Sequence, residues 1–306
     1  MENLEKFYIN GRWVTPNSTE TMPVSNPATE QKIGRITLGN GTDVDRAVTA
    51  ALTAFEEFSQ TSKAQRLSLL LRLKSVTEAR FEDLAQAMRL EMGAPISMAR
   101  SDQADAAVGH LQGFIDALEK LEEQITLASG DVLVREPIGV CGLITPWNWP
   151  MNQIVLKVVP ALATGSCCIL KPSEHTPISA MIYAEIIDEA GYPPGVFNLV
   201  NGDGPTVGAA LSRHADIQMM SFTGSTRAGI AVTQDAAPTV KRVTLELGGK
   251  SPNLVFADCD LENQITASVQ ECMFNSGQSC DAPTRLLVER ACYDQALDIA
   301  KRAGEA

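Results

Sequence analysis

Ile138-Gly-Val-Cys-Gly-Leu-Ile-Thr145 is an apolar, strand-like run, and it opens the alternating pattern that decides the fold. Further strand-like runs follow at 166–171, 196–201, 217–222 and 240–246. Helix-like segments lie between or after them, at about 152–163, 177–190, 204–213 and 225–236. Strands that alternate with helices predict an α/β fold with a doubly wound parallel sheet. Ligands of such sheets bind beyond the carboxyl ends of the strands, so the residues that follow each strand are the candidates for function.

The residues before this stretch predict a hairpin and several helices. Asn10-Gly11 is a dipeptide that favours a hairpin turn, and Ser62 with Gln65 forms a capping box at the start of a helix. The expected elements are a hairpin of two short strands at 7–14, helices at about 43–58, 62–92 and 96–121, and a short strand at 131–137.

The composition argues against several classes of protein. The 306 residues carry a net charge of −12, which disfavours nucleic acid and anionic membrane surfaces as partners. The N-terminus shows no secretory signal, and no apolar run is long enough to span a membrane. The seven Cys form no Cys-x-x-Cys pair and the three His show no metal-ligand spacing. We therefore expect no disulfide framework, no metal site, and reduced thiols in a cytoplasmic protein.

Polar residues follow three of the predicted strands. Asn148 lies in a rigid loop rich in Trp and Pro, where its amide could donate to a developing oxyanion. Lys171 and Glu174 together could hydrogen-bond a ribose diol, and Ser225 is a natural N-cap of a helix whose N-terminus attracts phosphate. The usual Gly-x-Gly-x-x-Gly fingerprint and the P-loop are both absent here. Taken singly, each feature also has a structural alternative: a turn Asn, a surface ion pair and a simple strand-to-helix turn.

Two further residues suit catalysis. Glu246 lies between two Leu at the end of a strand expected to be buried, where a desolvated carboxylate would be a better base near neutral pH. The alternative is a Glu paired with a cation such as Lys250. Cys280 follows a small polar stretch that contains Gly277, which suits a partly exposed, reactive thiol. The alternative is an ordinary structural Cys.

Five motifs occur in order along the chain: Pro146-Trp-Asn-Trp-Pro150, Lys171-Pro-Ser-Glu174, Phe222-Thr-Gly-Ser225, Leu245-Glu-Leu-Gly-Gly-Lys250 and Gly277-Gln-Ser-Cys280. This ordered set resembles the aldehyde dehydrogenase superfamily, and the resemblance runs from the N-terminal hairpin to the end of the chain. The motifs around Glu246 and Cys280 are highly specific to that superfamily.

The resemblance implies NAD-dependent oxidation of an aldehyde to a carboxylic acid, through a thiohemiacetal and a thioester on Cys280. It makes Glu246 the general base, and it makes Asn148 with the backbone N–H of Cys280 the oxyanion hole. Lys171 and Glu174 would hold the adenosine ribose, and Glu174 would disfavour NADP by repelling its 2′-phosphate. The other implied cofactor-binding residues are Ile144, Trp147, Ser173, Gly204, Gly208, Phe222, Gly224, Ser225, Leu247 and Gly248, with Trp147 and Ser225 near the pyrophosphate.

The resemblance also implies a domain arrangement: an NAD-binding domain at 1–122 and 138–247, an oligomerisation hairpin at 123–137, and the start of an α/β catalytic domain at 248–306. Members of the superfamily continue past this point, so we expect the catalytic domain to be incomplete within this sequence. The implied partners are a small aldehyde and, in a longer chain, one or three further copies of the protein. One alternative is a truncated, non-catalytic relative that binds nucleotide. Another is a CoA-acylating semialdehyde dehydrogenase, but those relatives commonly lack the base, so Glu246 counts against it.

Overall fold

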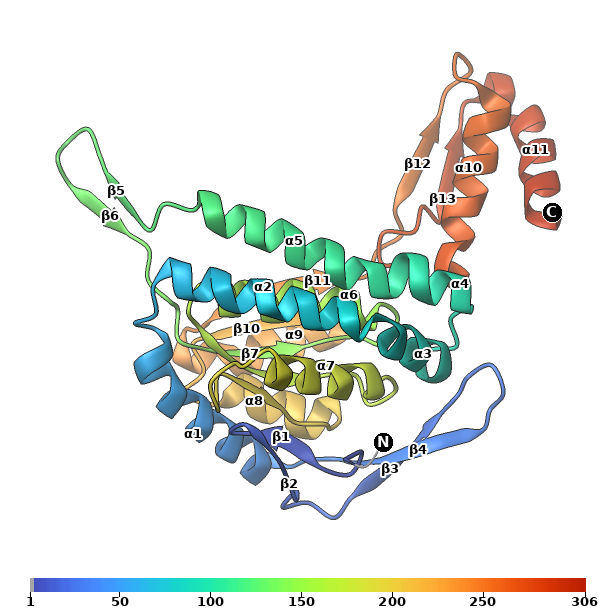
Figure 1. Cartoon of the computed structure of the whole chain (residues 1–306). Coiled ribbons are helices and arrows are strands. Elements are labelled where there is room, and N and C mark those ends of the chain that lie inside the picture. Colours follow the sequence, from blue (N-terminus) through green and yellow to red (C-terminus); the bar gives the residue numbers. More distant parts are fainter. Residues whose placement is uncertain (1–2) are drawn as a thin grey trace. The chain divides into compact units, whose positions relative to one another are not determined.

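A seven-stranded sheet forms the centre of the first of two structural units. The computed structural model describes residues 3–306, with one unit ending at Glu246 and the other running from Leu247 to Ala306 (Figure 1). The strand order is β11-β10-β7-β8-β9-β1-β2. The strands are β1 (Phe7–Ile9), β2 (Arg12–Val14), β7 (Val140–Ile144), β8 (Cys167–Lys171), β9 (Phe197–Leu199), β10 (Met219–Gly224) and β11 (Arg242–Leu247). Because β7 to β10 pair in parallel, the predicted parallel sheet is confirmed.

The order of the strands identifies a switch point beside β7. The chain adds β8 and β9 on one side of β7, and then adds β10 and β11 on the other side. In doubly wound sheets the ligand crevice lies at such a reversal, outside the carboxyl ends of the strands. Ile144 lies opposite Lys171 on one neighbouring strand and opposite Phe222 on the other, so the three carboxyl ends are level.

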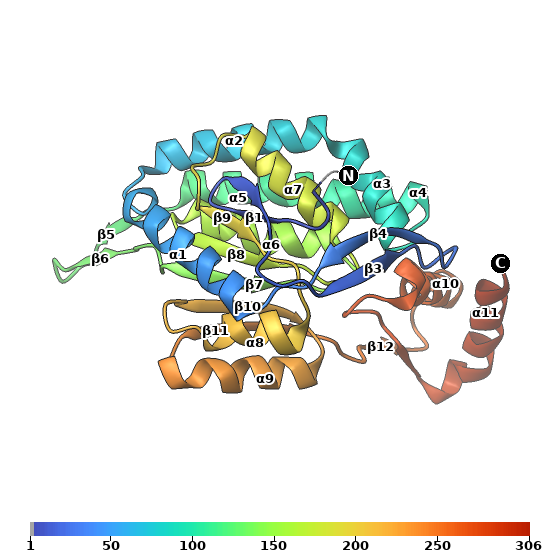
Figure 2. The same cartoon turned by 90° about the horizontal axis from the view of Figure 1, so that it is seen from below.

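Helices cover both faces of this sheet (Figure 2). One face carries α6 (Pro150–Ala163) and α7 (Ile178–Glu189), with α2 (Lys63–Ala79), α3 (Phe81–Glu91) and α5 (Asp105–Lys120) packed against them. The other face carries α1 (Gly41–Phe58), α8 (Ala209–Arg213) and α9 (Thr226–Ala236). All residues of β7 and β8 are buried, which explains why these strands are continuously apolar and do not alternate.

The prediction of one continuous helix over 62–92 is wrong, because the structure has two helices there. The Ser62–Gln65 capping box starts α2 as expected, but the chain breaks at Arg80 and continues as α3. Arg80 leaves helical geometry at φ −98° and ψ 14°, and its guanidinium pairs with Asp83, Glu185 and Glu189. The amphipathic pattern continues across the break, so hydrophobic periodicity does not reveal it.

The helix predicted over 96–121 is present with a local irregularity. It begins as α4 (Ile96–Met98), widens into the π-helical turn η1 (Ala99–Ala104), and continues as α5. A π-helical turn accommodates an extra residue, which changes the direction of the side chains that follow. Hydrophobic periodicity does not reveal a single wide turn of this kind.

Two of the three hairpins were anticipated at least in part. Asn10 and Gly11 have φ of 53° and 73°, as a type I′ turn requires, and they join β1 to β2 as predicted. The hairpin β3 (Thr21–Ser25) with β4 (Lys32–Thr37) was not predicted. The strand expected at 131–137 is β6 (Val132–Val134), which ends early and pairs with β5 (Gln124–Thr126). Its role in oligomerisation stays a prediction.

The second unit is a small α/β arrangement. Parallel strands β12 (Pro252–Val255) and β13 (Arg285–Val288) pack with α10 (Leu261–Met273) and α11 (Tyr293–Glu305). Its core centres on Val255, Ile265, Ala296 and Ile299. The remaining short helical turns of the chain are η2 (Gly204–Gly208), η3 (Ala237–Thr239), η4 (Phe274–Gly277) and η5 (Arg290–Cys292).

Residues 3–306 contain no helix that is both long and apolar enough to cross a membrane. Over the same residues, no cluster of three or more His, Cys, Asp or Glu side chains could hold a metal ion. All seven cysteines are free thiols.

Candidate functional site

The carboxyl ends of β7, β8 and β10 bring several predicted residues together. Ile144, Lys171 and Phe222 are lateral neighbours across these three strands. Gly208 packs beside them, because a Cβ on Gly208 would lie 3.6 Å from Ile144 Cδ1. Gly204, in contrast, is exposed and has no atom within 4 Å of such a Cβ. The strand ends thus bring Ile144, Lys171, Phe222 and Gly208 together, whereas no described contact links Gly204 to them.

Lys171 and Glu174 form an ion pair at the end of β8, with 3.1 Å between Nζ and Oε2. The Lys171 side chain is 4% exposed and that of Glu174 is 25% exposed. Burial lowers the pKa of Lys171, against the influence of Glu174. Burial acts to raise the pKa of Glu174, but the charge of Lys171, a backbone hydrogen bond and the hydrogen bond from Lys171, with His175, together lower the pKa overall. An ionised pair with a buried cation and an accessible carboxylate differs from the surface ion pair that the sequence left open.

Ser173 fixes the loop that carries this pair. It is buried, and its Oγ accepts a hydrogen bond of 3.3 Å from the backbone N–H of His175. The local role of Ser173 is therefore to shape the turn between Lys171 and Glu174.

Ser225 caps α9 as the sequence predicts. Its Oγ accepts from the backbone N–H of Ala228 at 3.2 Å, and the residue is exposed at the end of β10. Gly224, just before it, lies against the ring of Phe222. A Cβ there would approach the ring to 2.6 Å, so only glycine fits without displacing Phe222. The exposed N-terminus of α9 is thereby held beside β7, where a phosphate group would find unpaired backbone N–H donors.

Asn148 lies in the loop between β7 and α6. Pro150 begins α6, a position that favours proline because the missing N–H is not needed there. Asn148 is half-buried, whereas Trp147 is 42% exposed. The backbone carbonyl of Asn148 accepts a hydrogen bond of 3.1 Å from Gln103 Nε2. The catalytic role of the Asn148 amide stays a prediction.

Sequence reasoning missed a polar contact between α6 and β10. Lys157 is buried, and its Nζ donates to Ser221 Oγ at 3.0 Å. Burial lowers the pKa of Lys157 to about 8, although the charge of Glu246 acts in the opposite direction. One turn earlier, Gln153 Oε1 accepts from Thr223 Oγ1 at 2.8 Å. The single Lys in the otherwise apolar run 154–163 was the sequence signal for the contact of Lys157.

The expected burial of Glu246 is wrong. β11 is the edge strand of the sheet, and its residues alternate between exposed and half-buried positions, with Glu246 exposed. The ion pair with Lys250 is also absent from the described residues. Alternation of apolar and polar residues along Arg242–Leu247 is the pattern of a half-exposed strand and could have indicated this position.

Cys280 is exposed in the second unit, as the sequence predicts for a reactive thiol. Cys141, Cys167 and Cys168 are buried in β7 and β8, and burial raises the pKa of their thiols. Three successive residues before Cys280, namely Asn275, Ser276 and Gly277, have φ between 51° and 71°. Non-glycine residues in this region are costly, which marks a tightly constrained segment.

Leu247 and Gly248 also belong to the second unit. A Cβ on the next residue, Gly249, would lie 3.7 Å from the backbone oxygen of Cys280. The turn after β11 therefore runs beside the Cys280 backbone.

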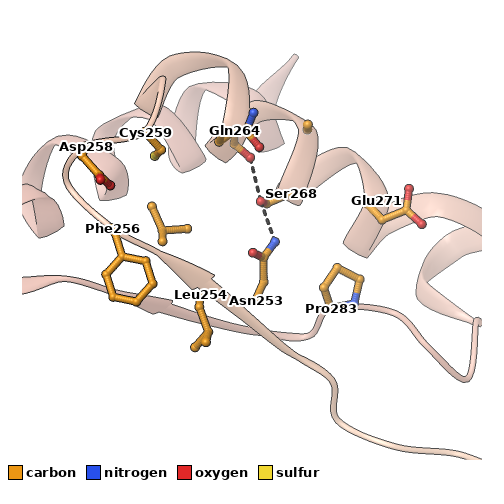
Figure 3. A pocket seen from close by; sticks show the side chains of 11 residues that line it. Asn253, Leu254, Phe256, Asp258, Cys259, Gln264, Ser268, Glu271 and Pro283 are labelled. Carbon is orange, nitrogen blue, oxygen red and sulfur yellow. Dashed lines mark hydrogen bonds between the residues drawn. The ribbon is translucent and has the colours of Figure 1, made fainter.

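A separate pocket of about 420 Å³ lies in the second unit between β12 and α10 (Figure 3). Asn253 Nδ2 donates to Ser268 Oγ at 2.7 Å, and Ser268 Oγ donates to the carbonyl of Gln264 at 2.6 Å. None of the predicted site residues lines this pocket. It lends no support to the predicted chemistry.

The strand order and the residues at its switch point place the first unit in the class of doubly wound α/β proteins that bind ligands at the carboxyl edge of a parallel sheet. Comparison with known proteins narrows the class. Residues 13–305 match the model of the aldehyde dehydrogenase family, and the chain belongs to that family.

Similar proteins cover this chain almost completely. A 3-succinoylsemialdehyde-pyridine dehydrogenase from a Pseudomonas species is 51% identical over 98% of this chain and 63% of its own length. The structure of aldehyde dehydrogenase C from Pseudomonas syringae, a cysteine-to-alanine mutant complexed with NAD+ and octanal, is 48% identical with a TM-score of 0.97, covering 99% of this chain and 62% of that one. An NAD+ complex of aldehyde dehydrogenase from Bacillus cereus is 37% identical with a TM-score of 0.94, covering 98% and 63%. The chain thus spans less than two thirds of these relatives.

Proposed function

We propose that this protein oxidises an aldehyde to a carboxylic acid with NAD+ as the hydride acceptor. The observation that carries the proposal is the ion pair of Lys171 with Glu174 at the switch point of the sheet, in a chain that belongs to the aldehyde dehydrogenase family. The similarity to proteins whose structures are described with NAD+ supports the choice of cofactor.

The residues of the first unit fit such a cofactor. Glu174 offers a lowered pKa and an accessible carboxylate, which suits it to accept hydrogen bonds from both hydroxyls of a ribose. The same charge opposes a 2′-phosphate, so NAD+ is preferred to NADP+. The exposed N-terminus of α9 at Ser225 suits a pyrophosphate. Ile144, Gly208 and Phe222 give an apolar wall beside these polar groups, and we assign Trp147, Ser173, Gly204, Gly224, Leu247 and Gly248 to the same cofactor site.

In the proposed reaction, the Cys280 thiolate adds to the aldehyde carbon and leaves a negative charge on the carbonyl oxygen. The Asn148 amide and the backbone N–H of Cys280 donate to that oxygen, a contribution of about 3–4 kcal/mol for a well-placed donor. Bound NAD+ supplies the acceptor for the hydride that leaves the tetrahedral carbon. A thioester on Cys280 remains. Glu246 then takes a proton from water, the resulting hydroxide adds to the thioester carbon, and the thiolate departs as the acid is released.

Several features of the whole protein belong to the same proposal. The substrate is a small aldehyde, as octanal is in the structure of the P. syringae relative. The β5–β6 hairpin carries exposed Val132, Leu133 and Val134, which suit it for association with further copies of the chain. The seven free thiols suit a reducing compartment, and we assign the protein to the cytoplasm.

The test is NADH formation from octanal, propanal and benzaldehyde by the wild-type protein and two cysteine variants. Cys280→Ala should reduce turnover by more than about a thousandfold while leaving NAD+ affinity unchanged. Cys272→Ala is the matched control, because Cys272 is a partly buried thiol of α10 and should be dispensable. Turnover retained by Cys280→Ala would disprove the nucleophile. A wild-type protein that binds NAD+ but oxidises no aldehyde would instead favour the non-catalytic alternative.

A further inference from the structure

Gln103 is a fully buried polar residue that the proposed function does not use. It lies in the π-helical turn η1, and its side chain is 0% exposed. Glutamine is rarely buried to this extent without a purpose for its amide, since an unpaired amide in an apolar environment is costly. π-Helical turns inside α-helices are frequent at functional sites, because the extra residue redirects a side chain.

The wide turn points the Gln103 amide at the loop between β7 and α6. Gln103 Nε2 donates to the backbone oxygen of Asn148 at 3.1 Å. η1, the turn that carries Gln103, packs against both α3 and α6. Its Oε1 is buried and has no hydrogen-bond partner among residues 3–306. The amide of Gln103 therefore makes its bond to Asn148 through Nε2, while its Oε1 is buried without a partner, which is costly.

We propose that Gln103 is a positioning residue that holds the Asn148 backbone so that the Asn148 side-chain amide stays aimed at the reacting oxygen. This inference rests on the proposed role of Asn148. A hydrogen bond to the carbonyl of residue 148 restrains the peptide plane between Asn148 and Trp149, and so limits rotation at the Cα that carries the amide. An oxyanion donor acts only within a narrow range of positions, and a displacement of about 1 Å can reduce the rate about a hundredfold.

A purely structural role for Gln103 predicts a different outcome. In that case its removal would lower the stability of the first unit and would affect substrate binding and turnover together. A positioning role predicts a loss that appears in kcat, with KM little changed, because the oxyanion forms only after the substrate has bound. The two roles also predict different effects on kcat when substitutions at Gln103 and Asn148 are combined.

The experiment is a double-mutant cycle in NADH formation, with Gln103→Leu, Asn148→Ala and the combination of both. Gln103→Leu keeps the approximate size of the side chain and removes the donor. Gln112→Leu is the matched control, because Gln112 is an exposed glutamine of α5 that bonds only to Asp116 among the described contacts. We expect Gln103→Leu to lower kcat by about tenfold to a hundredfold, and to have little further effect once Asn148 is already Ala.

The outcomes separate this inference from the function on which it rests. If Asn148→Ala retains full kcat, the proposed role of Asn148 fails and the inference fails with it. If Asn148→Ala is impaired but the losses of the two substitutions multiply, Asn148 keeps its role and Gln103 acts independently, which overturns only the inference. A wild-type protein without turnover overturns both.

A second variant keeps the test decisive if Gln103→Leu does not fold. Gln103→Glu can donate to the Asn148 carbonyl only when the introduced carboxyl is protonated, and burial raises its pKa. Its kcat relative to wild type should therefore recover as pH falls. A ratio that is independent of pH would contradict the proposal.

Discussion

Glu91 offers a direct test of how the fold supports the loop that carries Lys171 and Glu174. Glu91 ends α3 and is 2% exposed, and its carboxylate accepts from the backbone N–H groups of Ile178 and Ser179 at the start of α7. These two donors would otherwise be unsatisfied at a buried helix end. Burial nevertheless raises the pKa of Glu91 to about 7, although the hydrogen bonds from Ile178 and Ser179 act to lower it.

The consequence is a stability that depends on pH. Below pH 4.5, the ordinary pKa of a glutamate side chain, the carboxyl of Glu91 is protonated in both the folded and the unfolded protein. Between 4.5 and about 7 the unfolded carboxyl ionises while the folded one keeps its proton, so rising pH favours unfolding. Because one pKa unit corresponds to about 1.4 kcal/mol, the free energy of unfolding should fall by about 3 kcal/mol over this range and then stay level. Glu91→Gln cannot ionise and should lack this fall.

The assay is urea unfolding of wild type and Glu91→Gln between about pH 5 and about pH 8. Tryptophan fluorescence reports on the first unit alone, since the three Trp are at positions 13, 147 and 149. Glu82→Gln is the control, because the hydrogen bonds from Arg100 lower the pKa of the exposed Glu82 to about 2, below this pH range. Parallel pH profiles for wild type and Glu91→Gln would refute the reasoning and show that the α7 donors keep Glu91 ionised throughout.

Three further predictions concern single side chains. Glu246→Gln should permit one rapid round of NADH formation and then stall, because the thioester is no longer hydrolysed; a normal steady state in stopped-flow absorbance would exclude Glu246 as the base. Glu174→Gln should narrow the ratio of kcat/KM for NAD+ over NADP+, since the charge that repels a 2′-phosphate is gone, and an unchanged ratio would argue against the ribose contact. Burial lowers the pKa of Lys157 from 10.5 to about 8, so wild type should lose about 3 kcal/mol of stability as pH falls through this range. For Lys157→Met, the free energy of unfolding in urea should lack this difference between about pH 10 and about pH 7. An equal decrease in wild type and Lys157→Met would contradict the burial argument.

The sequence predicted the features that depend on residues close together along the chain. The continuous apolar runs of β7 and β8 could only be buried on both faces, and the alternation with helices then required a parallel sheet. Asn10-Gly11 and the Ser62–Gln65 pair form the turn and the cap that their chemistry favours. The residues after the strands could be selected as candidates because parallel strands present their carboxyl ends at one edge.

Features that depend on distant partners were not predictable in the same way. The helix break at Arg80 is accompanied by ion pairs with Glu185 and Glu189, more than a hundred residues away. The position of β11 at the sheet edge depends on the order of all strands, so the alternation of its own residues was the only local sign that Glu246 is exposed. The hairpin β3–β4 contains Pro23, which normally argues against a strand except at an edge.

The polar residues that sequence reasoning missed share one location. Glu91 in α3, Gln103 in η1 and Lys157 in α6 all belong to the helical layer on the same face of the sheet. Each bonds to a different element: Glu91 to the start of α7 within the layer, Gln103 to the Asn148 carbonyl after β7, and Lys157 to Ser221 on β10. In an amphipathic helix, a single buried polar residue is nearly invisible against the apolar face, yet its desolvation must be offset by a specific partner. These contacts therefore restrain the segments that follow β7 and β8, and join α6 to β10, by directional bonds as well as by apolar packing. Substitutions at any of the three residues should alter the site while leaving the strand order intact.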